Sequence, residues 1–555
     1  MEPIGYLAPA VYQDSYRSLA VSNLSQTHAG GLVHEVGRRR TFAIISHPDA
    51  GKTTLTEKLL LYSGAVDLAG AVRGRKNGRH ATSDWMALEQ QRGISITTTA
   101  LQFEFEGRLL NLLDTPGHQD FSEDTYRTLM AVDSAVMVLD SVKGIEPQTL
   151  KLFEVCRTRG LPILTFINKL DQEGRAPLDL LDEIERVLGI TAVPVNWPIG
   201  QGSRFQGVYD RNRQEVLRFR RTERNERRAP VIAVPLHDAR LVAELGDEAA
   251  HSLRDDVALL DTASHAFDRD AFLNEKATPV FFGSALNNFG VEPFLAALIE
   301  LAPPPAARRS DGRIVEPTAE SFSAFVFKIQ ANMDPKHRDR MAFMRVCSGR
   351  FKKDMLVHHA RLDREIRMTR PHRLFARDRE TVEEALPGDV VGVVNPGVFV
   401  IGDTVSEDAS VRFDAIPKFE PECFAVIRCV AVDKSKRFHR GMKQLEEEGA
   451  IQLLVAADGG RRDVILAAVG ELQFDVVVSR LDSEYGVSAA IERLPYVAAR
   501  YIVADPAVIS EILWPYQGVP KLHDGAGRLV VLFRSQRDVD YCVERNPKVE
   551  FLRLG

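Results

Sequence analysis

The sequence feature that most constrains the fold is the octapeptide Ser46-His47-Pro48-Asp49-Ala50-Gly51-Lys52-Thr53, which follows an apolar run and opens a helical pattern. The apolar run, 42–45, predicts a buried strand. A turning loop between a strand and a helix directs backbone N–H groups and the positive end of the helix dipole towards phosphates. In such a loop Lys52 can reach the β- and γ-phosphate oxygens, and the Thr53 hydroxyl can ligate Mg²⁺. The strict pattern has Gly at position 46, so this segment alone is a weak indication of a nucleotide site.

Three further polar motifs follow in order, each directly after a short apolar run. In Asp114-Thr115-Pro116-Gly117-His118, the carboxylate can hold Mg²⁺ through water and the Gly117 N–H can contact a γ-phosphate. In Asn168-Lys169-Leu170-Asp171, the Asp171 carboxylate can accept hydrogen bonds from guanine N1–H and the 2-amino group, donors that adenine lacks. Ser284-Ala285-Leu286 can close the site by backbone contact with the guanine oxygen.

Together the four motifs predict one guanine-nucleotide site. Any one of them could be an ordinary polar turn, but all four in this order are much harder to obtain by chance. The runs at 109–113, 135–139, 163–167 and 280–282 predict further strands, and open α/β sheets bind ligands at the carboxyl ends of their strands. The predicted ligands are GTP or GDP with Mg²⁺. The predicted nucleotide-binding residues are Ser46, His47, Pro48, Asp49, Ala50, Gly51, Lys52, Thr53, Thr54, Asp114, Thr115, Pro116, Gly117, His118, Asn168, Lys169, Leu170, Asp171, Ser284, Ala285 and Leu286.

The chain is 555 residues long, which is enough for several domains. Alternating strand and helix patterns over 38–305 predict an α/β P-loop GTPase domain with an inserted subdomain at about 196–275. After the linker Ala302-Pro303-Pro304-Pro305, short strands punctuated by Gly predict a β-barrel domain at 306–415. The order strand, helix, strand, strand, helix, strand predicts an α+β ferredoxin-like domain with a C-terminal extension at 416–555. Its helices are predicted at Ser435–Glu448 and Gly470–Tyr485.

Charge and composition restrict the function further. Residues 1–37 lack periodicity and predict a disordered tail without a function. The net charge of −6 means that any RNA contact must come from a local patch. The Arg-rich stretch at 211–228 is such a patch, but its interleaved glutamates favour a solvated hairpin over RNA binding. Five scattered cysteines without a CxxC pair predict reduced thiols in a cytoplasmic protein. No apolar run is long enough to span a membrane.

The motif set resembles the GTPase superfamily, and the His directly after Asp-Thr-Pro-Gly is similar to the translation factors. In those factors this histidine positions the attacking water and depends on the ribosome, which implies that His118 is the catalytic residue. The family also guards the water with an apolar gate, which maps to Pro48 and Ile94. No arginine finger is evident, since Arg92 is a candidate only by position. We therefore expect a slow GTPase that a large partner activates.

The first switch loop is also recognisable by resemblance. Arg92-Gly93-Ile94-Ser95-Ile96 is similar to the family pattern, which usually has Thr in place of Ser95. Serine keeps the hydroxyl that ligates the metal. The resemblance therefore implies that Thr53, Ser95 and Asp114, the last through water, hold Mg²⁺.

The long segment between Asp171 and Ser284 resembles an insert shared by the translocase elongation factor and the class II release factors. Only about 60 residues follow Arg493, too few for the two further translocase domains, one of which mimics tRNA. Several short sequence segments are similar to the class II release factor family, bacterial peptide chain release factor three. The matching segments are Ser83–Met86, Ser122–Leu129, Phe327–Arg340 and Gly470–Val478.

This resemblance implies a ribosome-dependent GTPase of translation termination that promotes dissociation and recycling of class I peptide chain release factors, acting as a monomer. The chain has no Gly-Gly-Gln tripeptide, which marks factors that promote ester hydrolysis. Three alternatives stay open. One is a translocase-like GTPase. Another is a metabolic P-loop enzyme, such as the GTPase subunit coupled to sulfate activation, which would lack the large insert. The third is a nucleotide-regulated binding module without turnover, against which Lys52, Thr53, Asp114 and His118 count.

Overall fold

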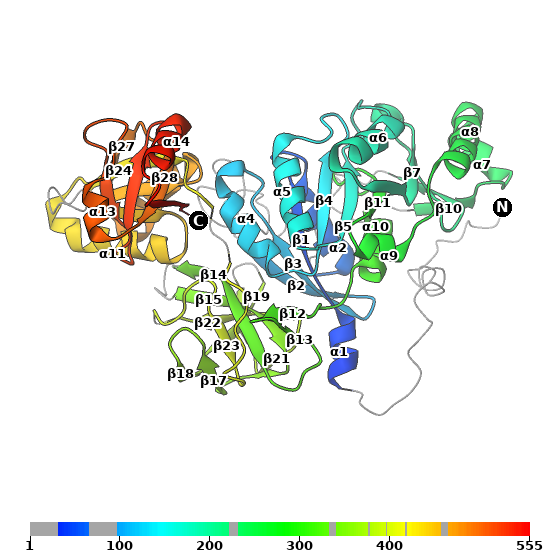
Figure 1. Ribbon diagram of the computed structural model, residues 1–555. Coiled ribbons are helices and arrows are strands. Elements are labelled where there is room, and N and C mark those ends of the chain that lie inside the picture. Colours follow the sequence, from blue (N-terminus) through cyan, green and yellow to red (C-terminus); the bar gives the residue numbers. More distant parts are fainter. Residues whose placement is uncertain are drawn as a thin grey trace.

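Figure 1 shows a computed structural model of the chain. It describes residues 31–65, 97–220, 231–331, 340–375, 378–395, 397–416, 419–456 and 464–554. The first described element is α1 (Leu32–Arg38). The prediction of a disordered tail is therefore wrong for its last residues. Arg39 Nη1 donates to the Glu35 carbonyl at 2.6 Å and to the Glu35 carboxylate at 2.9 Å, so a basic residue satisfies the carboxyl end of this helix.

A seven-stranded sheet forms the centre of the molecule. In spatial order its strands are β2 (Thr99–Phe105), β3 (Arg108–Asp114), β1 (Arg39–Ser46), β4 (Ser134–Asp140), β5 (Ile163–Asn168), β11 (Ala277–Phe282) and β6 (Thr191–Pro194). All pairings are parallel except that of β2 with β3. Four of the strands, β1, β4, β5 and β11, are buried along their whole length, as is usual for the central strands of a parallel sheet with both faces covered. The five predicted strands are confirmed, and the edge strands β2 and β6 are additional.

Helices cover both faces of this sheet, because successive side chains of a strand point to opposite faces. Phe42 and Ile44 of β1 belong to a core shared with α2 (Lys52–Ser63) and α10 (Val291–Leu301). Ala43 and Ile45 belong to the opposite core. The helices on that side are α4 (Ser122–Leu129), α5 (Pro147–Thr158) and α6 (Pro177–Leu188). The carboxyl ends of the parallel strands stay uncovered by this packing.

The predicted insert is a small antiparallel sheet with helices. Its strands are β7 (Asn196–Ile199), β8 (Gly207–Asp210), β9 (Glu215–Phe219) and β10 (Val231–Pro235), followed by α7 (Arg240–Leu245), α8 (Asp247–Ala263) and α9 (Arg269–Leu273). β9 pairs antiparallel with β10, and residues 221–230 of the Arg-rich stretch lie outside the described residues. Arg218 pairs with Glu244, and Arg211 with Asp261. These arginines therefore already have carboxylate partners.

The middle of the chain forms the predicted β-barrel around its own apolar core. In spatial order its strands are β18 (Arg364–Arg367), β17 (Leu356–His359), β23 (Thr404–Ser406), β14 (Ser323–Ala331), β15 (Arg340–Ser348), β22 (Val390–Val394), β19 (Pro371–Phe375) and β20 (Asp378–Thr381). Two short pairs complete it, β12 (Arg308–Ser310) with β13 (Arg313–Val315), and β16 (Phe351–Lys352) with β21 (Glu384–Ala385). Figure 1 places this barrel beside the central sheet and below α4.

The last part of the chain begins with the predicted ferredoxin-like order. Its elements are β24 (Cys423–Cys429), α11 (Ser435–Glu447), β25 (Gln452–Ala456), β26 (Val464–Ala468), α12 (Leu472–Tyr485) and β27 (Ala489–Leu494). The predicted extension continues the same sheet. It adds β28 (Ala498–Val503), α13 (Pro506–Ser510), β29 (Lys521–His523), β30 (Leu529–Phe533), α14 (Gln536–Arg545) and β31 (Glu550–Arg553). The extension is thus integral to the domain, since β29 pairs directly with β25.

All five cysteines are free thiols, and three of them are buried. Over the described ranges, none of the helices has the length and apolar character needed to cross a lipid bilayer.

Candidate nucleotide site

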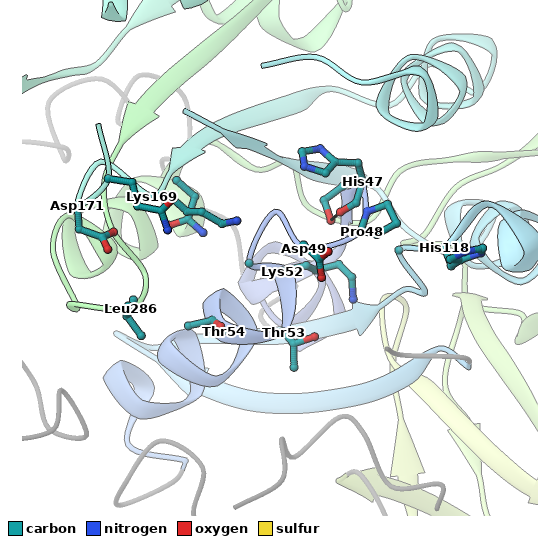
Figure 2. A pocket seen from close by; sticks show the side chains of 15 residues that line it. His47, Pro48, Asp49, Lys52, Thr53, Thr54, His118, Lys169, Asp171 and Leu286 are labelled. Carbon is teal, nitrogen blue, oxygen red and sulfur yellow. Dashed lines mark hydrogen bonds between the residues drawn. The ribbon is translucent and has the colours of Figure 1, made fainter. Parts of the chain in front are cut away.

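The predicted motifs meet at a pocket of about 340 Å³ beyond the carboxyl end of β1. Figure 2 shows Asp171 and Leu286 on one side, Lys52 and Thr53 in the centre and His118 on the other side. The lining residues are Ser46, His47, Pro48, Asp49, Gly51, Lys52, Thr53, Thr54, Gly117, His118, Asn168, Lys169, Asp171, Gln172 and Leu286. The predicted residues that do not line it are Ala50, Asp114, Thr115, Pro116, Leu170, Ser284 and Ala285. The sequence missed Gln172, whose one signal is its position after Asp171.

Gly51 shapes the phosphate loop. Its φ is +92°, and a Cβ at this position would lie 2.3 Å from Nδ2 of Asn168, so only glycine fits. Asn168 Nδ2 donates to the Ala50 carbonyl at 2.8 Å, and its Oδ1 accepts from the Ala285 N–H at 2.9 Å. Asn168 therefore braces the first motif against the fourth. This brace joins residues that are more than a hundred positions apart in the sequence.

Two residues at the start of the loop turn their side chains elsewhere. Ser46, where the strict pattern has Gly, donates its hydroxyl to the His47 carbonyl at 2.9 Å and is buried. The φ of Ser46 is not positive, so glycine is not required at this position. The buried His47 ring places Nε2 3.0 Å from a Glu146 oxygen, and burial lowers the pKa of His47. Figure 2 shows this ring pointing away from Lys52, so His47 can face the pocket through its backbone.

The centre of the pocket carries a buried charge pair. Lys52 Nζ lies 2.7 Å from Asp114 Oδ1, and the two side chains are only 6% and 1% exposed. The other oxygen, Asp114 Oδ2, is buried and has no hydrogen-bond partner within the described part of the chain. A buried acceptor without a donor is costly, and a water held on Mg²⁺ would satisfy it. Together with the hydroxyl of Thr53, the residues present therefore fit this metal. The other predicted ligand, Ser95, and the switch residues 92–94 lie outside the described residues.

The base-reading end is ordered by contacts between the third and fourth motifs. Ser284 Oγ donates to Asp171 Oδ1 at 2.5 Å, and the Leu170 N–H donates to the Gly283 carbonyl at 3.2 Å. Lys169 Nζ lies 2.8 Å from Asp140 Oδ2. Burial alone would raise the pKa of Asp140, but hydrogen bonds from Lys169 and two backbone N–H groups hold this pKa below its ordinary value. Asp171 lines the pocket, so its carboxylate can face a planar pair of donors there.

His118 lies at the opposite end, after Gly117, which packs against the phosphate loop. A Cβ on Gly117 would be 3.6 Å from Cα of Pro48, so one half of the predicted gate lies beside the second motif. His118 Nδ1 is 3.1 Å from Asp120 Oδ1, and the Asp120 N–H donates to the same nitrogen at 3.3 Å. The histidine side chain is 28% exposed. Its ring is therefore held at the rim, within reach of both protein and solvent.

Comparison with known proteins adds to this geometry. The family description "Elongation factor Tu GTP binding domain" matches residues 37–304, "Elongation factor G domain 2" matches 321–408, and "Class II release factor RF3, C-terminal domain" matches 413–543. Peptide chain release factor 3 of Gloeobacter violaceus is 56% identical over 524 residues, which cover 94% of this chain and 99% of the relative. The proteins of the same name from Cyanothece sp. and Symbiobacterium thermophilum are 54% and 52% identical, covering 94% of this chain and 96% and 98% of theirs. The chain belongs to the peptide chain release factor 3 family.

Membership of the peptide chain release factor 3 family gives the pocket its ligand class. This family member is a translational GTPase of the termination stage, and its α/β domain binds guanine nucleotide. The metabolic P-loop enzyme considered above is thereby excluded. A crystal structure of a Thermus thermophilus protein has a TM-score of 0.65 and covers 87% of this chain and 72% of that one. At 23% identity it shows likeness of fold alone.

Proposed function

We propose that this GTPase binds the ribosome after peptide release and uses GTP to speed the dissociation of class I peptide chain release factors. The observation that supports this most strongly is the C-terminal match over 413–543. The protein would work as a monomer in the cytoplasm, and its functional units would be 38–305, 306–415 and 416–555.

At the nucleotide, each motif would have a separate role. The backbone of the loop ending at Gly51 would face the phosphates, Lys52 would neutralise their charge, and Asp171 would select guanine. Thr53, Ser95 and, through water, Asp114 would hold Mg²⁺. A bound Mg²⁺ supplies positive charge where negative charge develops during phosphoryl transfer. The orphaned Asp114 Oδ2 supports this assignment.

Hydrolysis would depend on His118 and on a partner. His118 would hold the attacking water in line with the γ-phosphate. None of the residues that line the described pocket is an arginine. The transition state would therefore lack an arginine charge from that lining, which supports activation by a large complex. GTP and GDP would favour two different conformations of the protein. The nucleotide can then change the state of the ribosome only as far as the affinity of the ribosome for these two conformations differs.

The test uses ribosomes that have released their peptide and still carry a labelled class I factor. Adding this protein with GTP should speed loss of the label, while the first round of peptide release should be unchanged. Lys52→Ala should abolish the effect, because Lys52 lies in the pocket. Lys353→Ala is the matched control, since that lysine forms a surface pair with Glu383 on the barrel. An unchanged departure rate of the label, or movement of tRNA and messenger by one codon, would refute the proposal.

A further inference from the structure

The C-terminal domain is docked on the segment that follows the second motif. Asp120 Oδ2 accepts a hydrogen bond from the backbone N–H of Leu472, the first residue of α12, at 2.7 Å. Arg127, two turns along, donates to the carbonyls of Glu448 and Gly449 just beyond α11, at 3.4 and 3.3 Å. An anion therefore meets a helix N-terminus and a cation meets a helix C-terminus. Both contacts match the sign of the helix dipole.

At two glycines beside these contacts there is no room for a larger side chain. A Cβ on Gly470 would lie 2.2 Å from Cγ of Asp120, and a Cβ on Gly449 would lie equally close to Arg127. Phe121 and Val476 are buried against each other in the same interface. The predicted helix start at Gly470 is consequently shifted to Leu472, where the side chain of another domain supplies the acceptor. Asp120 itself is only 7% exposed.

The same carboxylate also faces His118. Its Oδ1 lies 3.1 Å from His118 Nδ1, while its Oδ2 is held by the Leu472 N–H. One side chain thus connects the N-terminus of α12 with the residue at the hydrolytic end of the pocket. His118 and Leu472 are far apart in the sequence, and η3 (Gln119–Phe121) is the short element that brings them together.

The surroundings of His118 Nδ1 allow two arrangements. In one, Nδ1 accepts from the backbone N–H of Asp120, and the ring proton is on Nε2. In the other, Nδ1 carries the proton and donates to Asp120 Oδ1, which leaves the Nε2 lone pair able to accept a hydrogen bond from water. Only the second arrangement suits a residue that must hold a nucleophilic water. An anchored carboxylate favours it, because its charge stabilises the proton on Nδ1.

We propose that Asp120 is a positioning residue through which docking of the C-terminal domain prepares His118 for GTP hydrolysis. The inference rests on the catalytic role proposed for His118. While Leu472 holds Oδ2, the carboxylate stays in place to accept the Nδ1 proton. If α12 moves away from η3, Asp120 loses this anchor. The backbone N–H of Asp120 then donates to His118 Nδ1 and keeps the proton off this nitrogen. The hydrolysis rate would then report whether the C-terminal domain is docked.

The decisive variant is Asp120→Asn. The new side chain can still accept the Leu472 N–H through its oxygen, so docking should persist, but its amide donates to His118 Nδ1 and fixes the wrong arrangement. We expect the ribosome-stimulated kcat to fall by about 10-fold or more, approaching the loss of about 10²-fold expected when an acid–base group is removed. GTP affinity, the KM for ribosomes and the thermal unfolding midpoint should stay near wild type. A residue with only a structural role would not separate kcat from these quantities.

A second variant approaches Asp120 from the C-terminal domain. Gly470→Ala should displace the carboxylate and lower kcat, whereas Gly525→Ala is a matched control because its nearest neighbour would be 3.7 Å away. Neither glycine has a positive φ, so neither change strains the backbone. In an Asp120→Ala background, Gly470→Ala should have no further effect on kcat, because the colliding group is gone.

His118→Ala serves as the reference and should reduce stimulated hydrolysis by about 10²-fold or more with GTP binding nearly intact. If His118→Ala is impaired while Asp120→Asn hydrolyses at the wild-type rate, the inference about Asp120 is wrong and the proposed function stands. If His118→Ala itself keeps the wild-type rate, the catalytic role fails and the inference fails with it. A fall in kcat for Asp120→Asn that is absent in the His118→Ala background supports the inference.

Discussion

At the scale of single residues, base selection depends on the carboxylate of Asp171, which Ser284 fixes by a hydrogen bond of 2.5 Å. Asp171→Asn replaces an acceptor by a donor, so guanine binding should weaken by about 1.5–3 kcal/mol. Preference should shift towards xanthine nucleotides, which offer an acceptor there. Titration with GTP and XTP measures both effects. Asp179→Asn, an exposed position on α6, is the control, and unchanged discrimination by Asp171→Asn would remove Asp171 from base reading.

At the scale of elements, α4 is tied to the start of β2 and to the barrel. Asp124 Oδ2 accepts from the N–H and hydroxyl of Thr98 at 2.7 and 2.8 Å, and Lys328 Nζ donates to the Thr98 carbonyl. Burial alone would raise the pKa of Asp124, but Lys328 and Thr98 together bring this pKa below its ordinary value of 3.8. A carboxyl with a lowered folded pKa stabilises the fold above its unfolded pKa, and this stability is lost as pH falls through the folded value.

We therefore expect Asp124→Asn to reduce the free energy of unfolding at neutral pH by about 1–3 kcal/mol. The same variant should lose less stability than wild type on acidification below about pH 4, since it has no proton to bind there. Denaturant titrations across this pH range measure both quantities. Asp255→Asn, whose side chain is 70% exposed, is the control. Parallel pH profiles for Asp124→Asn and wild type would show that the shifted carboxyl does not contribute.

At the scale of the whole molecule, a buried ion pair joins the barrel to the central sheet. Arg345 of β15 pairs with Asp133, just before β4, and both side chains are at most 2% exposed. Arg345 also donates to Thr41 Oγ1 in β1 and to the Gly388 carbonyl. Because β1 leads directly into the phosphate loop, this pair connects the barrel with the strand that carries the nucleotide motif.

Asp133→Ala should leave the Arg345 guanidinium buried without its anion and lower the free energy of unfolding by about 3–5 kcal/mol. Adding Arg345→Met should restore part of this loss, because the uncompensated charge is then removed. Chemical denaturation of the two variants and wild type gives the comparison. A double variant no more stable than Asp133→Ala would contradict this account of the interface.

The sequence by itself determined the strands and motifs of the nucleotide site. Phe42–Ile45 and Ile163–Ile167 are mostly apolar runs followed by polar residues, a pattern that is visible in the local sequence. The Gly at position 51 and the ferredoxin-like element order are likewise visible in the local sequence, whereas the close approach of Asn168 to Gly51 is not. The family resemblance then added roles for His118 and Ser95 that no periodicity encodes.

The tertiary structure decided which distant residues meet. The pairing of β29 with β25, the brace from Asn168 to Ala50 and the contact from Asp120 to Leu472 join segments with no shared pattern in the sequence. The neighbour of an edge strand depends on how whole domains pack together. The same holds for a helix cap that comes from another domain, because in both cases the hydrogen-bond partner is distant in the sequence. Hydrophobic periodicity shows which face of an element is buried, and only the assembled fold shows what covers that face.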